Sequence, residues 1–488
     1  MVGTYIAPYT RGVHVYLIGI CGTGMGSLAS LLAEAGHRVT GSDPSPRPPM
    51  SEVLERKGID ILEGWDAANV DRMRPDLVVV GNVCRKDNPE ALRAVELDIE
   101  RMSMPATIRR LLLPGRRALV VAGTHGKTTT TALLGSILLG AGLDPTILVG
   151  GDALDIGGSA RLGKGPHFVI EGDEYDSAFF EKVPKLWSYE PWAAIIGSVE
   201  HDHLDIYPDE ASYLRAFEGF VDRIAPDGLL AVWAADPLAM AVAERAQCRV
   251  LPYALTTDTV VGSRPELVAT LRESTRSLGP HRLELVIRWP DRTRSVISTP
   301  LAGAHNARNA LAAIALCREV CGLDPEAIGK NIARFRGVAL RQQHVGTRRS
   351  IRVYRDFAHH PEAVAQTLLA MRPMAHPGRL VVAYEPRSAT ACRRLHQEDY
   401  KRALALADVV VMAPVGRPEI PTDERLDTAD IARSLRARGV TATSASSIDQ
   451  VLTALVARLK PGDLVLLLSN GHFGHVDERL LHRLEHDR

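Results

Sequence analysis

The stretch Gly123-Thr124-His125-Gly126-Lys127-Thr128 decides the fold, because it joins a strand pattern to a helix pattern. The apolar run 118–122 before it predicts a buried parallel strand, and TTTALLGSILLGAG over 129–142 predicts a helix that ends at glycines. In such a turn the backbone N–H groups point at an anion, Lys127 adds a positive charge, and the Thr128 hydroxyl is a ligand for Mg²⁺. The early glycine is Gly123 rather than residue 121, so the loop is a variant P-loop. We therefore expect ATP or a close relative to bind at Gly123, Thr124, His125, Gly126, Lys127, Thr128 and Thr129.

Length and charge narrow the class of protein. The 488 residues suffice for about three domains. Basic and acidic residues balance at 58 each, which leaves no excess of positive charge for a nucleic-acid-binding role. The six cysteines form no CxxC pair, as is usual in a reducing compartment. With no signal-type segment and no long apolar run, we expect a cytoplasmic protein without membrane insertion, present as a monomer or weak dimer.

Strand and helix patterns alternate in three successive blocks, which predicts an α/β fold of three tandem domains. We expect a Rossmann-like domain over 1–115, a P-loop domain over 116–337 and a smaller Rossmann-like domain over 338–488. The first block has a strand at 14–18, a turn containing Gly22, Thr23 and Gly24, and a strand over 38–43 that ends at Asp43. A carboxylate at that place faces a ribose in Rossmann-like units. The glycines miss strict GxGxxG, so the turn favours a nucleotide without specifying NAD.

Polar residues that follow predicted strands are the candidates for chemistry in the second and third blocks. Glu171 closes one apolar strand, and His203 follows the strand predicted over 193–199. Together with the Thr128 hydroxyl they would hold Mg²⁺, although a salt bridge explains Glu171 and a structural hydrogen bond explains His203 equally well. The EGDEYD run over 171–176 is open to the reading of a solvated turn.

Three further positions have competing explanations. Asn306 stands at a predicted helix start, where it either caps the helix or contacts the nucleotide. Asp356 opens the run DFAHHP, whose adjacent histidines rarely ligate one metal ion together. Arg387 in EPRS follows a strand and would bind a carboxylate, unless it is an ordinary surface arginine.

The motifs GICGTGM, GSD, GTHGKTTT, EGDEYD, VEHDHLDIYP, HNARNA, DFAHHPEAV and EPRS occur in this order along essentially the whole chain. In this combination the chain resembles the Mur ligase family. The resemblance implies ATP-dependent amide ligation by a UDP-sugar domain, an ATPase domain and a Rossmann-like domain for the amino acid or peptide. The segments EPRSAT and SNGHFGH resemble the branch that joins UDP-N-acetylmuramate to the recycled tripeptide L-alanyl-γ-D-glutamyl-meso-diaminopimelate.

The resemblance also implies roles for single residues. Lys127 and Thr128 would hold the ATP phosphates and Mg²⁺, with Glu171 and His203 at the metal. Asn306 would contact the nucleotide, Arg341 would reach the phosphates, and Asp356 would bind the ATP ribose. The residues that would face the UDP-sugar are Gly22, Thr23, Gly24 and Asp43, and Arg387 would meet the peptide. The expected catalytic residues are Lys127, Arg341 and His203.

The chain departs from the family pattern at some of these sites. Ser198 stands where the family usually has Asn, Leu340 where a second Arg is common, and Arg355 where Asp is frequent. Three other functions stay open on sequence grounds. They are a ligase that adds L-alanine alone, an NAD oxidoreductase built on the first glycine-rich turn, and a non-catalytic sensor of ATP and UDP-sugar.

Overall fold

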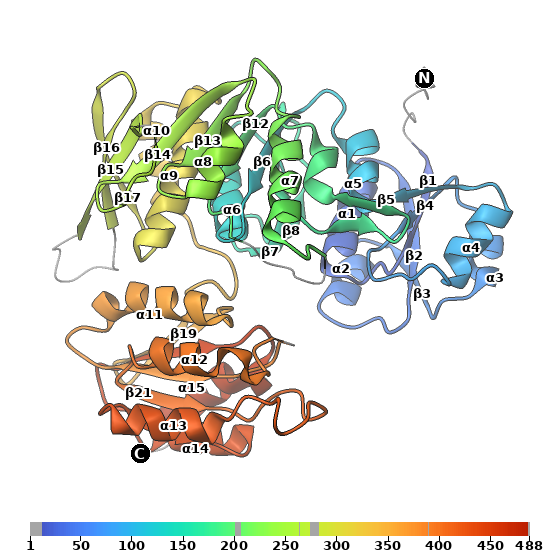
Figure 1. Cartoon of the computed structure of the whole chain (residues 1–488). Coiled ribbons are helices and arrows are strands. Elements are labelled where there is room, and N and C mark those ends of the chain that lie inside the picture. Colours follow the sequence, from blue (N-terminus) through green and yellow to red (C-terminus); the bar gives the residue numbers. More distant parts are fainter. Residues whose placement is uncertain (1–11, 201–205, 263, 274–282, 389, 487–488) are drawn as a thin grey trace. The chain divides into compact units, whose positions relative to one another are not determined.

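The fold is described from a computed structural model that covers residues 12–200, 206–262, 264–273, 283–388 and 390–486 (Figure 1). The chain divides into two compact units. The first is built from the described residues up to 273 with 284–300 and 307–336. The second contains Leu283, residues 301–306 and the described residues from 337 onward.

The N-terminal part of the first unit is a parallel sheet in the order β3-β2-β1-β4-β5. Strand β1 is buried along its whole length, as its unbroken apolar sequence predicts for a strand covered on both faces. The elements are β1 His14–Ile18, α1 Thr23–Glu34, β2 Arg38–Asp43, α2 Met50–Arg56, β3 Asp60–Glu63, α3 Ala67–Met73, β4 Leu77–Val80, α4 Pro89–Glu96, β5 Glu100–Ser103, α5 Met104–Thr107 and the π-helical turn Ile108–Leu112.

The rest of the first unit is organised around a long sheet in the order β17-β16-β15-β14-β13-β12-β6-β9-β7-β8. Strand β6 lies between β12 and β9 and runs parallel to both, so the loop that follows it opens at the carboxyl edge of the sheet. The elements are β6 Arg117–Ala122, α6 Lys127–Gly140, β7 Thr146–Ala153, β8 Gly158–Arg161, β9 His167–Gly172, β10 Asp176–Ala178, β11 Glu181–Pro184, the 3₁₀ turn Lys185–Tyr189, β12 Ala193–Ile196, α7 Glu210–Val221, β13 Leu229–Trp233, α8 Pro237–Ala243, β14 Arg249–Leu255, β15 Leu267–Glu273, β16 Leu283–Arg288, β17 Arg294–Thr299, α9 Ala304–Glu319 and α10 Pro325–Ile332.

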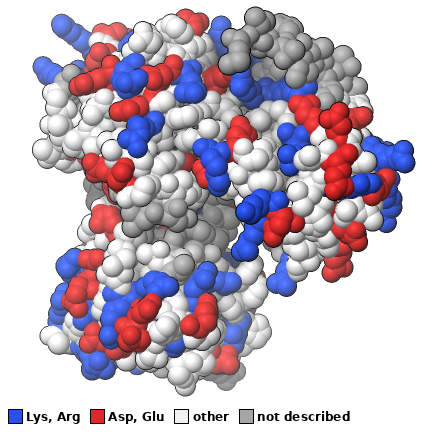
Figure 2. All heavy atoms as spheres, turned by 45° about the vertical axis from the view of Figure 1, so that its right-hand side comes forward, with Lys and Arg blue, Asp and Glu red and all other residues white. Residues whose placement is uncertain are grey.

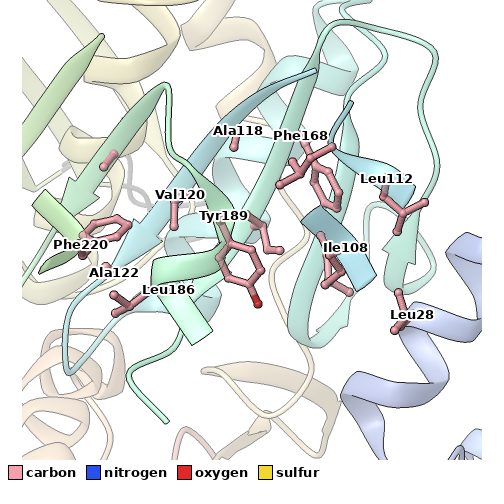
Figure 3. Close-up of a cluster of buried hydrophobic side chains, with 14 of the residues drawn as sticks. Leu28, Ile108, Leu112, Ala118, Val120, Ala122, Phe168, Leu186, Tyr189 and Phe220 are labelled. Carbon is pink, nitrogen blue, oxygen red and sulfur yellow. The ribbon is translucent and has the colours of Figure 1, made fainter. Parts of the chain in front are cut away.

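The two parts of the first unit share one hydrophobic core. Leu28 of α1 and Ile108 belong to the same cluster as Val120 of β6 and Phe168 of β9 (Figure 3). Polar contacts add to it, because the Ser27 and Ser159 hydroxyls lie 2.6 Å apart. The β10–β11 hairpin extends this connection, since Phe179 packs against the buried cluster around β1 and β4. The sheet that holds the P-loop and the N-terminal sheet are therefore packed as one body.

The second unit is a sheet in the order β18-β19-β23-β20-β21-β22, parallel except for the β18–β19 pair. Alternate residues of β20 point to opposite faces, with Val382 packed among α11, α12 and α13 and Val381 among α14 and α15. The elements are β18 Gln343–Arg348, β19 Ile351–Asp356, α11 Pro361–Ala375, β20 Leu380–Tyr384, the 3₁₀ turn Arg394–His396, α12 Gln397–Leu404, β21 Val409–Met412, α13 Thr428–Ala437, β22 Thr441–Ser444, α14 Ile448–Val456, β23 Leu464–Leu468, the 3₁₀ turn Phe473–His475 and α15 Val476–His486.

Helix length and surface charge characterise the exterior of the described residues. None of their helices is both long and apolar enough to cross a membrane. On the face drawn in Figure 2, Lys and Arg side chains are interspersed with Asp and Glu side chains.

Candidate active site

The P-loop lies between β6 and α6, as its sequence predicts. Helix α6 begins at Lys127 and ends at Gly140, two residues before each of the predicted limits, because the loop residues Lys127 and Thr128 already form the first helical turn. Gly126 has φ 81°, in the left-handed region that favours glycine, and a Cβ there would lie 2.4 Å from Asn309 Oδ1. The motif therefore requires glycine at this position for both its backbone angle and its space.

The Lys127 ammonium is anchored at the base of this loop. Its Nζ donates to Gly123 O at 2.7 Å and lies 3.1 and 3.4 Å from the two carboxylate oxygens of Glu174. The Glu174 side chain is fully buried and that of Lys127 is 12 % exposed. Burial disfavours the ammonium, but the carboxylates of Glu174 and Asp173 outweigh this effect and raise the pKa of Lys127. Lys127 is therefore a fixed positive charge at the phosphate loop.

Thr128 and Glu171 form the second pair at this loop. Glu171 lies in β9 directly across from Val121 of β6, and the Thr128 hydroxyl donates to Glu171 Oε2 at 3.1 Å. The other carboxylate oxygen accepts from Gly150 N at 2.5 Å. Burial and the nearby Asp173 raise the pKa of Glu171 to about 7, against the lowering effect of the Gly150 N–H. The positive charge of Lys127 and the Thr128 hydroxyl also favour the carboxylate of Glu171, but burial outweighs them.

The donor set fits Mg²⁺, which prefers hard oxygen ligands and keeps several waters. Thr128 offers a hydroxyl and Glu171 a carboxylate, and the two already touch. His203 lies outside the described residues. Among the described residues, no group of three or more His, Cys, Asp and Glu side chains is arranged to hold a metal ion. The described ligands would thus need phosphate oxygens and waters to complete the coordination shell.

The P-loop is tied to the segment that follows β12. Thr124 N donates to Ser198 O at 2.7 Å, and His125 N donates to the Ser198 hydroxyl at 3.3 Å. Glu200 N donates to the Thr124 hydroxyl at 2.9 Å. The strand itself ends at Ile196, earlier than the predicted residue 199. Ser198 and Glu200 bond to the P-loop, and Val199 N donates to the Asp236 carboxylate, rather than to a neighbouring strand. Ser198, a departure from the family pattern, thus has a defined role here as an acceptor for the loop.

A cavity of about 580 Å³ lies beside this centre within the first unit. Its wall includes the ion pair between Lys182 and Asp176, whose Nζ and Oδ2 are 2.7 Å apart. Tyr207 also lines it and donates its hydroxyl to the backbone carbonyl of Glu174. The lining residues are Asn82, Asp176, Lys182, Pro184, Ile206, Tyr207 and Ser212. The cavity is therefore bordered by both the N-terminal part and the P-loop part of the first unit.

The predicted UDP-sugar residues lie together at the carboxyl edge of the N-terminal sheet. Gly22, Thr23 and Gly24 are exposed at the start of α1. Asp43 ends β2, and its carboxylate accepts from Cys21 N at 3.1 Å and from Ser45 N at 3.0 Å. Asp43 therefore holds the glycine-rich turn in shape in this structure.

The residues predicted to reach ATP from the C-terminal domain lie in the second unit. The Asp356 carboxylate accepts from Gln342 N at 2.7 Å and from Ala358 N at 2.8 Å. Burial raises the pKa of Asp356, against the lowering effect of the nearby Arg341. The Arg341 guanidinium lies 4.6 Å from the Phe357 ring centroid. Asp356 and Arg341 are thus neighbours, and the Asp356 carboxylate shapes the 340–342 segment.

The other positions in the second unit have partners of their own. Arg355, where the family frequently has Asp, pairs with Asp477 at 2.9 Å. Arg387 follows β20 and is exposed. Its guanidinium packs against Gly471, where an added Cβ would lie 2.3 Å from Nη1 of Arg387. Asn306 lies inside the first turn of α9, and its Nδ2 donates to Ala302 O at 3.0 Å, so it is not the N-cap of that helix.

Some contacts of this centre escape prediction from single motifs. Glu174 lies in the EGDEYD run, whose acidic composition favours a solvated turn, yet both Glu171 and Glu174 are buried. Only the pairing of β6 with β9 brings these side chains to the P-loop. Glu174 follows two residues after the end of β9, the strand that contains Glu171. Two acids three positions apart at the end of a strand that pairs with the P-loop strand would have predicted the role of Glu174.

Comparison with known proteins identifies the relatives of this chain. Residues 14–114 match the Mur ligase family catalytic domain, 121–317 the Mur ligase middle domain, and 340–471 the Mur ligase glutamate ligase domain. A UDP-N-acetylmuramate–L-alanyl-γ-D-glutamyl-meso-2,6-diaminoheptandioate ligase of Haemophilus influenzae is 35 % identical over 477 residues, 97 % of this chain and 99 % of that protein.

Two further relatives complete the comparison. A UDP-N-acetylmuramate–L-alanine ligase of Nocardioides sp. is 35 % identical over 480 residues, which is 98 % of each chain. The crystal structure of a murein peptide ligase of Psychrobacter arcticus has a TM-score of 0.67 and 31 % identity, and covers 98 % of this chain and all of that one. The three-domain α/β prediction is confirmed by these matches. The chain belongs to the Mur ligase family, whose members are ATP-dependent ligases that form C–N bonds.

Proposed function

We propose that this protein joins UDP-N-acetylmuramate to L-alanyl-γ-D-glutamyl-meso-diaminopimelate, with ATP converted to ADP and phosphate. Support for the substrates comes from the activity named for the Haemophilus influenzae relative and from the EPRS and SNGHFGH segments. This tripeptide is the material of peptidoglycan recycling, and the proposal includes a cytoplasmic location. We further propose domain limits at 1–115, 116–337 and 338–488.

The observation that carries the proposal is the paired arrangement at the P-loop. Lys127 is held by Gly123 O and Glu174, and Thr128 is held by Glu171. A fixed ammonium and a hydroxyl–carboxylate pair beside it are the groups that phosphoryl transfer requires, because the protein acts there by positioning and neutralising charge.

The proposed reaction has two stages. The lactyl carboxylate of UDP-N-acetylmuramate attacks the γ-phosphorus of ATP, which gives an acyl phosphate and ADP. The amine of the peptide's L-alanine then attacks the acyl carbon, loses a proton, and releases phosphate. Lys127 would neutralise charge on the transferred phosphoryl group, and exclusion of water would protect the acyl phosphate from hydrolysis.

The cofactor of this reaction would be Mg²⁺ held by Thr128, Glu171 and His203. It would supply positive charge at the phosphate oxygens. Thr128 and Glu171 would orient the phosphates relative to Lys127. For the remaining positions we propose the roles that the family resemblance implies: Asn306 and Asp356 at the nucleotide, Arg341 at the phosphates, Arg387 at the peptide, and Gly22, Thr23, Gly24 and Asp43 at the UDP-sugar.

The second candidate is a UDP-N-acetylmuramate–L-alanine ligase. A specific observation favours it, because the Nocardioides relative with that activity is also 35 % identical over nearly the whole chain. The two candidates share the acyl phosphate and differ only in the amine.

Two measurements test the reaction type. Phosphate release from ATP should require both UDP-N-acetylmuramate and an amine, and should be negligible when either is left out. Borohydride added during turnover should reduce the acyl phosphate to the corresponding alcohol of the muramic acid side chain, detected by mass spectrometry. Phosphate release that proceeds without UDP-N-acetylmuramate would contradict the proposed first stage.

A further inference from the structure

The contacts of Glu174 have a consequence for ATP. Glu174 lies three residues beyond Glu171, so one strand end supplies a buried glutamate to each of two successive P-loop residues. Glu171 meets the Thr128 hydroxyl, and Glu174 meets the Lys127 ammonium. The first contact belongs to the proposed metal site, and the second lies at the lysine that would neutralise charge on the transferred phosphoryl group.

Distances from Lys127 Nζ assign an acceptor to each of its N–H groups. An ammonium has three N–H donors. One meets Gly123 O at 2.7 Å and a second meets the Glu174 carboxylate at 3.1 Å, while Thr124 O lies at 3.5 Å, at the limit of hydrogen bonding. Two firm contacts fix the direction of the third N–H, and that weakly held N–H is the one that a phosphate oxygen would take.

Glu174 is itself held rigidly. Its side chain is fully buried, and the Tyr207 hydroxyl donates to its backbone carbonyl. A buried, charge-assisted contact of this kind holds a flexible lysine much more firmly than an exposed ion pair would.

We propose that Glu174 is a positioning residue for phosphoryl transfer, which fixes Lys127 so that its remaining N–H points to the phosphates of bound ATP. This inference rests on the proposed function for its substrate and on the P-loop contacts for its geometry. The proposal explains why Glu174, the second glutamate of EGDEYD, is buried and contacts Lys127. A role as a metal ligand or a place in a solvated turn would not explain that contact.

The test is a double-mutant cycle. Glu174→Gln keeps the size and one acceptor of the side chain but removes the charge, and should lower kcat about tenfold, since a hydrogen bond to a charged group contributes about that much. The KM for UDP-N-acetylmuramate should stay within about twofold, because Glu174 would act on the chemical step and not on sugar binding. Glu174→Asp should recover part of the loss. The matched comparison is Asp173→Asn, which removes an adjacent charge that acts on Lys127 from a distance. Asp173 is 34 % exposed and pairs with Lys185 at 3.6 Å, so its replacement should lower kcat less than Glu174→Gln does.

Binding of MgATP gives a readout that does not depend on the ligated amine. Glu174→Gln should weaken MgATP in the otherwise native protein and have no effect when Lys127→Ala is already present, because the coupling then has no partner. Equal losses in both backgrounds, or a loss in Asp173→Asn as large as in Glu174→Gln, would overturn the inference. If the native protein releases no phosphate with either amine, the proposed function fails, and the binding cycle still decides the role of Glu174.

Discussion

The charge and position of the Lys127 side chain are set by the groups around it. The ammonium is enclosed by Gly123 O and Glu174, so it is charged and fixed before a nucleotide arrives. We expect Lys127→Ala to lower ATP turnover by roughly 10²- to 10³-fold, the loss that follows removal of one preorganised charge-stabilising group. Binding of UDP-N-acetylmuramate, measured by isothermal titration, should persist. Loss of sugar binding in a folded Lys127→Ala protein would contradict this division of labour.

Glu171 predicts a pH dependence of stability. Its pKa in the folded protein is about 7, above the ordinary value of 4.5, because burial disfavours the carboxylate. The protonated side chain therefore stabilises the fold below the ordinary pKa, and that contribution is lost as pH rises through about 7. Without nucleotide, the melting temperature of the native protein should fall between pH 5 and pH 8 relative to Glu171→Gln by a few degrees. Parallel curves for the two proteins in scanning calorimetry would show that Glu171 is already ionised.

The position of a single residue can be predicted from the sequence when one contiguous motif defines the local backbone. The loop pattern alone places Lys127 and Thr128 between a buried strand and a helix, where the structure has them. The Thr128–Glu171 contact is observed, while the role of both residues at one metal ion stays a prediction. Glu174 and Ser198 could not be predicted so, because their contacts depend on strands β9 and β12 lying on either side of β6. The predicted metal, nucleotide and substrate roles of all the site residues stay predictions.

At the scale of elements, the P-loop and helix α9 fit together through one glycine. Gly126 and Gly142 have nearly the same φ, 81° and 80°, but a Cβ at Gly126 meets Asn309 whereas one at Gly142 meets open space. Alanine at either position should cost about 1–2 kcal/mol of stability for the left-handed backbone. Only Gly126→Ala should also abolish MgATP binding, measured by titration with a fluorescent ATP analogue. Equal nucleotide affinity in both variants would show that the loop tolerates displacement of Asn309.

Element limits were predictable where apolar runs end at glycine or a charge. The strands at 14–18 and 38–43 have the predicted limits, because each run is bounded by such residues. The strand that begins at residue 193 ends early, because Ser198 bonds to the P-loop and Val199 bonds to Asp236 instead of continuing the strand. The packing of the β10–β11 hairpin on the N-terminal part could not be predicted, because the sequence around Phe179 does not specify which cluster that ring joins.

At the scale of the whole molecule, the shared core of the first unit predicts how the protein unfolds. Leu28 of α1 packs in the same cluster as residues of β6 and β9, whereas Leu404 of α12 lies in a core of the second unit. Both side chains are fully buried, so alanine at either should cost about 2–5 kcal/mol. In calorimetry, Leu28→Ala should lower one transition that includes both the N-terminal and the P-loop parts, and Leu404→Ala should lower another. Separate melting of the N-terminal part would contradict a common core.

The amine that this ligase accepts decides between the two candidate reactions. The most direct measurement is a competition in which UDP-N-acetylmuramate and MgATP are supplied with equal concentrations of the tripeptide and free L-alanine, and the products are separated and weighed by mass spectrometry. The main product should carry L-alanyl-γ-D-glutamyl-meso-diaminopimelate, with one phosphate released for each amide formed. A product that carries L-alanine alone would contradict it and assign the protein to the alanine-adding reaction.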